Sequence, residues 1–282
     1  MNSLKVIGQT ANKETIEAWH KIPNFMIIEG ESGSGRKTMS TFIAKHFNAD
    51  IVPIGNKVDD VREIIEDARQ LTFPRIYLLD SNGMRVGAKN TLLKITEEPP
   101  HNCHIILLVH TVNDALPTLV SRCKLLTMLP YTKEEVEDYL VDVLGYKEKD
   151  ALTYSKLTNS LGNLRTMHHQ DLPRYYEKCT YFLDNIWNVS FGNSLNIVNW
   201  LRVKKADEEK EEKLDASLFV QCVLNMFHQD CLADYETFTA NQLSQNSIFI
   251  KSTSTCSTKL QNPLQTKEVT IHEWLRELSS IE

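Results

Sequence analysis

Short apolar runs alternate with helical patterns through the first part of this chain. Five runs rich in Ile, Leu, Val or Phe have the length of strands, at residues 25–28, 51–54, 76–79, 104–109 and 124–128. Between the second and third runs, apolar residues recur at helical spacing from Val58 to Leu71, and Asp59 and Asp60 favour the amino end of a helix. Strands that alternate with amphipathic helices pair in parallel, so this part predicts an α/β domain with a parallel sheet.

The pattern changes after the fifth run. The segment Thr132–Glu135 predicts a capping box ahead of an amphipathic helix, which Gly145 would close as its C′ residue. From about Asp171 onward the pattern stays helical, with a charged run at 204–213, interpreted as a solvated surface, and an apolar stretch at 214–231. We therefore predict three domains: an α/β domain at 1–130, a small helical domain at 131–172 and an all-α domain at 173–282.

Composition narrows the functional classes. The 282 residues are 41% apolar and 24% charged, and no apolar stretch approaches the roughly 20 residues of a membrane span. The amino terminus lacks an apolar signal segment and the six cysteines are scattered, so we expect a cytoplasmic location, reduced thiols and no metal site. Residues 129–282 hold 16 Lys and Arg against 23 Asp and Glu. A chain without a basic stripe is expected to share any DNA contact with partner subunits.

A glycine-rich turn after the first apolar run carries the main candidate chemistry. Glycines at 30, 33 and 35 have the spacing with which backbone N–H groups surround a phosphate at a helix amino terminus. The P-loop pattern then requires Lys and Ser or Thr, whereas the chain has Arg36 and Lys37, with Thr38 one place late. The candidate nucleotide-binding residues here and on the third run are Gly30, Gly33, Ser34, Gly35, Arg36, Lys37, Thr38 and Asp80.

The third apolar run has lost part of the chemistry that hydrolysis needs. It ends in Asp80, as a Mg²⁺-holding strand should, but Ser81 stands where an ATPase of this kind has a Glu that polarises the attacking water. Lys37 cannot ligate Mg²⁺, and Arg36 keeps a positive charge in a different shape from that of lysine. We therefore expect a fold built for ATP that no longer hydrolyses it.

Four segments occur in the order and at about the spacing found in the clamp-loader proteins of the AAA+ class: 58–69, 76–80, 90–100 and 116–123. Through them, residues 4 to about 170 resemble the bacterial DNA polymerase III delta-prime subunit, with features shared by gamma/tau and replication factor C small subunits. The resemblance is most specific at 97–100, Glu-Glu-Pro-Pro, and at 121–123, Ser-Arg-Cys. It implies an AAA+ P-loop domain, a helical lid at 131–172 and a helical collar at 173–282, through which subunits form a ring.

The resemblance also implies roles for single residues. Arg122, flanked by Ser121 and Cys123, corresponds to the arginine finger that acts in trans on the ATP of a neighbouring subunit. The implied partners are other clamp-loader subunits in a hetero-oligomeric ring, the sliding clamp and, as part of the complex, primer–template DNA. No membrane partner is implied.

Three further positions correspond to family features around the nucleotide. Gly8 and Gln9 match the segment that borders the adenine pocket, and Thr111, or His110 beside it, falls at sensor 1. Arg165 resembles the lid-borne sensor 2 arginine, which touches the γ-phosphate. No cofactor is predicted with certainty. ATP is a candidate ligand at the degenerate site or at the interface with a neighbouring subunit.

These features favour a non-hydrolysing, delta-prime-like clamp-loader subunit without intrinsic ATPase activity that presents Arg122 to a neighbour. One alternative is an active ATPase of the same architecture that uses Arg36 or Lys37 on the phosphates. Another is an interaction protein, such as a phage factor that mimics the delta-prime subunit and occupies a host loader. Turnover by the isolated chain distinguishes the first alternative, and assembly with cognate rather than host partners distinguishes the second.

Overall fold

The computed structural model describes residues 6–185, 197–202, 213–234, 237–261 and 265–280. The chain divides into two compact units, which meet in the sequence between Tyr131 and Thr132 and are described separately below. The predicted charged run at 204–213 lies outside the described residues except for Lys213. Within the described ranges, no helix is long and apolar enough to cross a bilayer.

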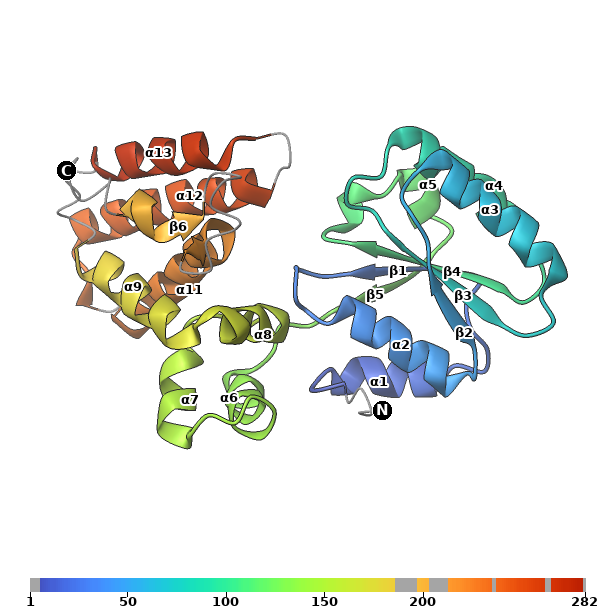
Figure 1. The fold of residues 1–282 in the computed structure, drawn as a ribbon, viewed down its shortest axis with the longest axis horizontal. Coiled ribbons are helices and arrows are strands. Elements are labelled where there is room, and N and C mark those ends of the chain that lie inside the picture. Colours follow the sequence, from blue (N-terminus) through green and yellow to red (C-terminus); the bar gives the residue numbers. More distant parts are fainter. Residues whose placement is uncertain (1–5, 186–196, 203–212, 235–236, 262–264, 281–282) are drawn as a thin grey trace. The chain divides into compact units, whose positions relative to one another are not determined.

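The first unit is built on a five-stranded parallel sheet (Figure 1). Its strands are β1 (Phe25–Glu29), β2 (Asp50–Pro53), β3 (Arg75–Asp80), β4 (Cys103–Val109) and β5 (Lys124–Thr127), in the order β2-β3-β4-β1-β5. Each predicted run is a strand, so the α/β prediction is confirmed. Because β4 lies between β3 and β1, the segments that follow these three strands meet at one edge of the sheet, where parallel sheets bind their ligands.

Helices cover both faces of this sheet (Figure 1). One face packs against α1 (Thr10–Glu17) and α2 (Arg36–His46), the other against α3 (Val58–Asp67), α4 (Val86–Glu97) and α5 (Pro117–Val120). Short 3₁₀ turns lie at Ala68–Gln70 (η1) and Val112–Asp114 (η2). Successive strand side chains enter opposite cores: Met26 joins the α1 and α2 side, while Ile27 joins the α3 and α4 side. Burial on both faces explains why β1 and β4 are continuous apolar runs.

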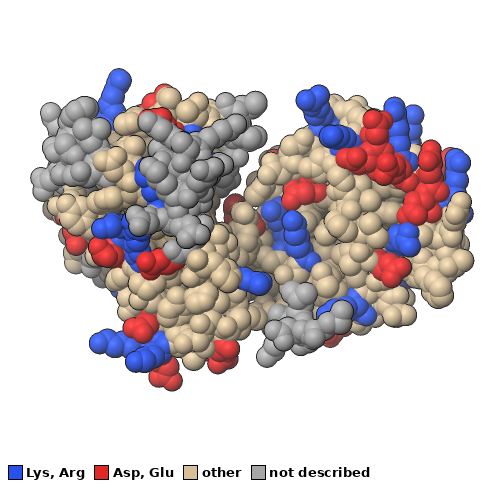
Figure 2. Space-filling view, in the orientation of Figure 1, with Lys and Arg blue, Asp and Glu red and all other residues tan. Residues whose placement is uncertain are grey.

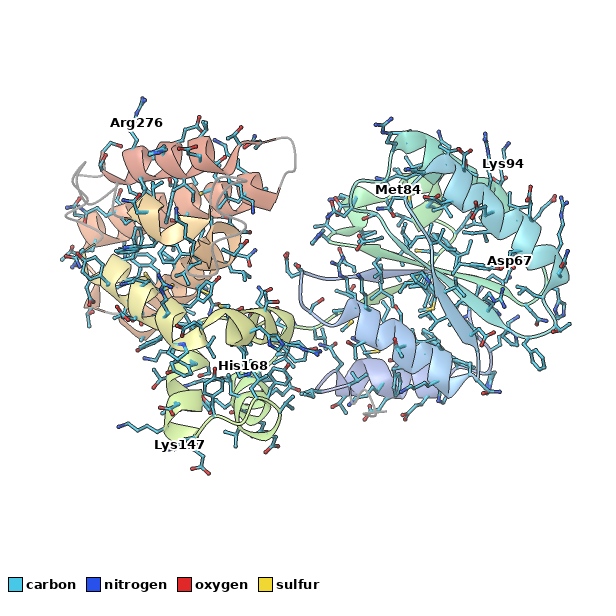
Figure 3. All side chains as sticks on the ribbon, viewed as in Figure 1. Asp67, Met84, Lys94, Lys147, His168 and Arg276 are labelled. Carbon is cyan, nitrogen blue, oxygen red and sulfur yellow. The ribbon has the colours of Figure 1, made fainter. Side chains whose placement is uncertain are left out.

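Three polar side chains fasten the end of α3 to β3. The Tyr77 hydroxyl donates a hydrogen bond of 2.6 Å to Asp67 Oδ2, and Arg75 Nη1 donates one of 2.8 Å to the same oxygen. Asp67, labelled in Figure 3, is the last residue of α3. The hydrogen bond from Tyr77, with that from Arg75, lowers the pKa of Asp67, whereas burial raises the pKa of Tyr77. The contact holds an ionised Asp67 against an otherwise buried phenol.

We predict that Asp67→Asn destabilises the first unit by about 1 kcal/mol at pH 7, since each hydrogen bond contributes about that amount and half-exposure screens the charge. Because the folded-state pKa of Asp67 lies below its unfolded value near 3.9, this stabilisation is present above about pH 4 and is lost as the pH falls further. Urea unfolding at pH 7 and pH 3 measures it. Asp59→Asn, which removes the more exposed pair with Arg62, is the control. Equal effects of Asp67→Asn at both pH values would contradict the assignment.

The second unit is mainly helical. Its helices within the described residues include α6 (Lys133–Asp142), α7 (Glu148–Tyr154), α8 (Leu161–Gln170), α9 (Leu172–Asp184), α11 (Ala216–Asp234), α12 (Ala240–Gln261) and α13 (Lys267–Leu278). Two short strands, β6 (Leu201–Arg202) and β7 (Leu214–Asp215), pair in parallel beside these helices. Each strand has only two residues, which is too short for an alternating apolar pattern to predict it from the sequence. The C-terminal region is thus helical as predicted, with this additional pair. Its division into a lid and a collar stays a prediction.

The cap predicted for the first helix of this unit is present. Thr132 Oγ1 accepts the backbone N–H of Glu135 at 3.2 Å, and the Glu135 carboxylate accepts the backbone N–H of Thr132 at 2.9 Å. The predicted end is wrong by one residue, because α6 ends at Asp142 with Val143 as its C-cap, which makes Leu144 the C′ residue. The Leu144 N–H closes the helix early by bonding the carbonyl of Tyr139. Gly145, at φ +76°, then turns the chain.

Candidate functional site

The glycine-rich loop joins β1 to α2 at the carboxyl edge of the sheet. Gly33 and Gly35 have φ angles of +79° and +91°, a left-handed conformation that favours glycine. A Cβ on Gly30 would lie 2.7 Å from Ser34 Oγ, and one on Gly35 would lie 2.8 Å from the hydroxyl of Tyr131. That hydroxyl donates a hydrogen bond of 3.0 Å to the carbonyl of Ser34. The loop thus needs glycine at all three positions, for its backbone angles or for its close packing.

Three side chains at the loop carry buried polar atoms without a hydrogen-bond partner in the described part of the chain: Ser34 Oγ, Arg36 Nη1 and His110 Nδ1. His110 directly follows β4. The carbonyl of Val109, the last residue of β4, accepts the N–H of Gly30 at 3.1 Å, so His110 lies beside the glycine-rich loop. Native proteins rarely leave such atoms unsatisfied. A phosphate oxygen would accept hydrogen bonds from Ser34 and Arg36, so this set of side chains fits a phosphate group.

Arg36 lies at the first position of α2, where the P-loop pattern has lysine. Burial lowers the pKa of Arg36, and the negative charges of Asp80, Glu31 and Asp114 oppose that shift. An arginine side chain stays protonated in either case. Arginine in place of the P-loop lysine therefore keeps a positive charge at the start of α2, near three carboxylates.

The same residues do not fit Mg²⁺, which takes oxygen ligands in an octahedral arrangement. The second position of α2 is Lys37, an exposed cation, and Thr38 follows one residue further along the helix. Asp80 Oδ1 accepts the backbone N–H of Asn82 at 3.0 Å, and Ser81 offers no carboxylate. Within the ranges that the structure describes, no three His, Cys, Asp or Glu side chains are grouped to hold a metal. The site therefore suits the phosphates of ATP better than its metal.

The two sensor 1 candidates differ in surroundings. Asp114 Oδ2 accepts the backbone N–H groups of Thr111 at 3.0 Å and His110 at 3.2 Å, which fixes the turn after β4. Thr111 is exposed, whereas His110 is partly buried with an unpaired ring nitrogen. His110 is thus the better placed of the two to meet a ligand in the loop.

Two side chains next to the site, those of Glu29 and Gln9, form hydrogen bonds that hold neighbouring segments together. Glu29 Oε1 accepts the N–H of Val112 at 2.8 Å, and its Oε2 accepts the hydroxyl proton of Thr127 at 3.1 Å, so the end of β1 is tied to both neighbours. The amide of Gln9 bonds both the N–H and the carbonyl of Leu129. Sequence reasoning missed Glu29. Its signal was a carboxylate at the end of an apolar strand, directly before the first glycine.

The sensor 2 candidate belongs to the second unit. Arg165 lies on the exposed side of α8, which Ser160 caps by accepting the N–H of Asn163 at 3.3 Å. Burial raises the pKa of Tyr139, and the positive charge of Arg165 opposes that shift. A role for Arg165 toward the glycine loop of the first unit stays a prediction.

The arginine finger candidate is held by two contacts within the first unit. Arg122 Nη1 donates a hydrogen bond of 2.9 Å to the carbonyl of Thr118, and Nη2 lies 3.2 Å from Glu97 Oε1. On either side, Ser121 Oγ bonds the carbonyl of Thr118 and Cys123 Sγ bonds a carbonyl of α5. Burial raises the pKa of the Cys123 thiol, so this cysteine is not a reactive thiolate.

Arg122 and the glycine loop lie at opposite edges of the same sheet. Arg122 precedes β5, which runs parallel to β1 with Met26 beside Lys124 and Glu29 beside Thr127. The loop follows the carboxyl end of β1. The paired residues span about 10 Å along the strands, at about 3.3 Å per residue. Arg122 lies before the amino end of this stretch, and the glycine loop lies after its carboxyl end. The guanidinium, which contacts Thr118 and Glu97, is thus separated from the chain's own phosphate loop.

Both signs of charge are interspersed over the face drawn in Figure 2. That face shows no continuous basic surface among the described residues. The net charge of the whole chain is −6.

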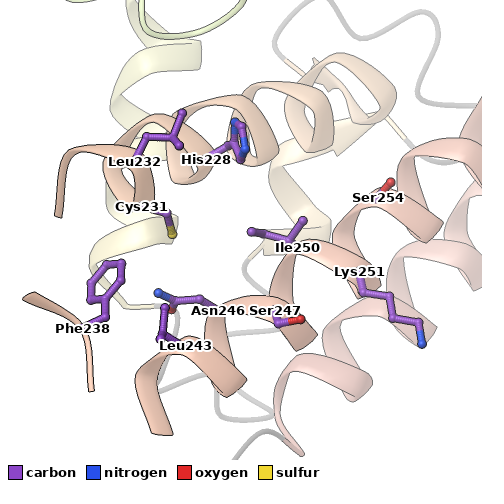
Figure 4. A pocket seen from close by; sticks show the side chains of 10 residues that line it. All are labelled: His228, Cys231, Leu232, Phe238, Leu243, Asn246, Ser247, Ile250, Lys251 and Ser254. Carbon is purple, nitrogen blue, oxygen red and sulfur yellow. The ribbon is translucent and has the colours of Figure 1, made fainter. Parts of the chain in front are cut away.

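A separate pocket of about 540 Å³ lies in the second unit between α11 and α12 (Figure 4). Its lining residues are His228, Cys231, Leu232, Phe238, Leu243, Asn246, Ser247, Ile250, Lys251 and Ser254. Figure 4 shows that the lining side chains come from both helices and, at Phe238, from the segment between them. None of the predicted site residues lines it.

Known proteins resemble this chain in fold and, over part of its length, in sequence. A solved structure from Thermotoga maritima, a DNA polymerase III gamma subunit-related protein, superposes with a TM-score of 0.51 over 96% of this chain and 98% of that one, at 17% identity. Residues 54–132 match the family described as DNA polymerase III, delta subunit. The superposition shows that this chain and that structure share a fold.

Over about half of its length, the chain is similar to clamp-loader subunits. It is 27% identical over 158 residues to DNA polymerase III subunit delta′ of Buchnera aphidicola, a match that covers 52% of this chain and 45% of that protein. It is 24% identical over 204 residues to replication factor C subunit 3 of Schizosaccharomyces pombe, which covers 58% and 60%. These matches span only about half the length of the curated relatives. They confirm the resemblance that the motifs predicted.

Proposed function

We propose that this chain is a non-hydrolysing, delta-prime-like subunit of a sliding-clamp loader, acting in the cytoplasm during DNA replication. It contributes Arg122 as an arginine finger to the ATP of a neighbouring subunit. The collar, residues 173–282, holds it in a hetero-oligomeric ring with other loader subunits, and the ring engages the clamp and primer–template DNA. ATP, where it binds this chain's own glycine loop, serves assembly rather than turnover.

One observation carries this proposal. The phosphate loop has kept its glycines and a cation but has lost the groups for Mg²⁺ and water, while Arg122 is intact at the opposite edge of the sheet. A guanidinium in that position cannot serve the chain's own loop and is available to another subunit. Positioning and charge neutralisation supply nearly all catalysis of phosphoryl transfer, so a site without metal and water-orienting groups has little turnover.

We expect no measurable ATP turnover by the isolated chain. In a loader complex rebuilt with the subunits that co-purify with it, Asp80→Asn should change steady-state ATPase less than twofold. Asn keeps the oxygen that accepts the Asn82 N–H, so the loop after β3 stays folded. The control is the equivalent substitution in a hydrolysing partner subunit, which should abolish that subunit's activity because it removes a Mg²⁺-holding carboxylate. A large loss with Asp80→Asn in this chain would instead support the active-ATPase alternative.

A further inference from the structure

The proposed function gives no role to the Glu-Glu-Pro-Pro segment, residues 97–100. Glu97 is the last residue of α4, and Glu98 follows it as the C-cap. Both side chains are exposed, yet only Glu97 forms an ion pair in the described part of the chain, with Arg122. The two most specific motifs of the sequence therefore meet through one contact between residues 25 positions apart.

The two contacts of Arg122 leave part of its guanidinium available. An arginine side chain has five N–H donors. One on Nη1 bonds the carbonyl of Thr118 and one on Nη2 faces the carboxylate of Glu97, so three remain without a partner among the described residues. The side chain keeps 42% of its exposure. The guanidinium is thus oriented at two points and still able to donate to a phosphate from outside the chain.

We infer that Glu97 is a positioning residue for Arg122, an inference that rests on the proposed function. The carboxylate and the Thr118 carbonyl hold the guanidinium in one orientation before a neighbour's ATP arrives. An exposed ion pair adds little to stability, so the role of this pair is to orient the guanidinium. A donor that is already oriented stabilises developing charge without the cost of ordering a long, flexible side chain during the reaction.

The first test uses the isolated chain and needs no partner. Phenylglyoxal modification, followed by peptide mass spectrometry, reports how available the Arg122 guanidinium is. We expect Glu97→Gln to speed modification of Arg122 severalfold, because the carboxylate no longer holds Nη2. Glu98→Gln is the matched control, since it removes the same charge from the adjacent residue. Equal modification rates in both variants and the wild type would overturn the ion pair in solution, and with it the inference.

The second test measures ATP hydrolysis in the reassembled complex. We expect Glu97→Gln to lower kcat about fivefold with little change in KM, since orientation matters most in the transition state. Glu98→Gln should leave both constants unchanged, and Glu97→Asp should restore part of the rate. If Arg122→Ala is strongly impaired while Glu97→Gln is normal, the inference fails and the proposed function stands. If Arg122→Ala is normal, both fail.

Discussion

Replacing Arg122 with alanine should slow ATP hydrolysis at the neighbouring subunit's site by about a thousandfold or more, because an arginine finger supplied in trans is worth that much in turnover. The loss should fall on kcat rather than on assembly, because the polar contacts of the Arg122 side chain among the described residues are with Thr118 and Glu97, both in its own unit. Single-turnover hydrolysis in rebuilt complexes measures it, since steady-state rates also include sites that this arginine does not reach.

Two further variants make this result specific. Arg122→Lys keeps the charge but loses the planar fork, so it should recover little of the rate. Arg62→Ala removes another exposed, ion-paired arginine from the same unit and should leave hydrolysis unchanged. A thousandfold loss in Arg122→Ala with normal assembly would support action in trans. Unchanged single-turnover kinetics would instead exclude Arg122 as a finger and leave a structural role for this chain in the ring.

The fold of the first unit could be predicted because its signals are local. Each strand contains a short apolar run, and turns or polar helix caps separate the runs. The runs of β1 and β4 are continuous because these strands are buried on both faces. The glycine loop was equally visible, because a left-handed φ at Gly33 and Gly35 confines those positions to glycine. Helix ends were less certain: α6 ends before Gly145 because a main-chain hydrogen bond closes it earlier.

The missed features depend on contacts between distant residues. Glu29 bonds residues 83 and 98 positions away, and Gln9 bonds one 120 positions away. The pairing of Glu97 with Arg122 is of the same kind. No periodicity encodes which charged residue will meet which backbone group once the sheet has formed. The unpaired atoms of Ser34, Arg36 and His110 were invisible for the same reason, since burial of one atom is a property of the folded site.

The second large effect concerns the core of the second unit, where Trp274 of α13 is only 2% exposed. Its ring stacks on Phe182 of α9 at a centroid distance of 5.2 Å, and its Nε1–H donates a hydrogen bond of 3.1 Å to Thr253 of α12. One side chain therefore joins three helices.

Trp274→Ala should destabilise the second unit by about 3–5 kcal/mol, through lost burial, a cavity and an unsatisfied Thr253 hydroxyl that is itself fully buried. Urea unfolding followed by circular dichroism measures it. Trp274→Phe keeps the ring but not the N–H and should cost less. Trp200→Ala, at a half-buried ring beside Tyr181, should cost well under half as much. A loss below about 1 kcal/mol in Trp274→Ala would contradict this packing. If 173–282 is the collar, Trp274→Ala should also lower incorporation into the loader complex at temperatures where the first unit stays folded. The reason is that unfolding of this core would disrupt the surface through which the collar binds neighbouring subunits.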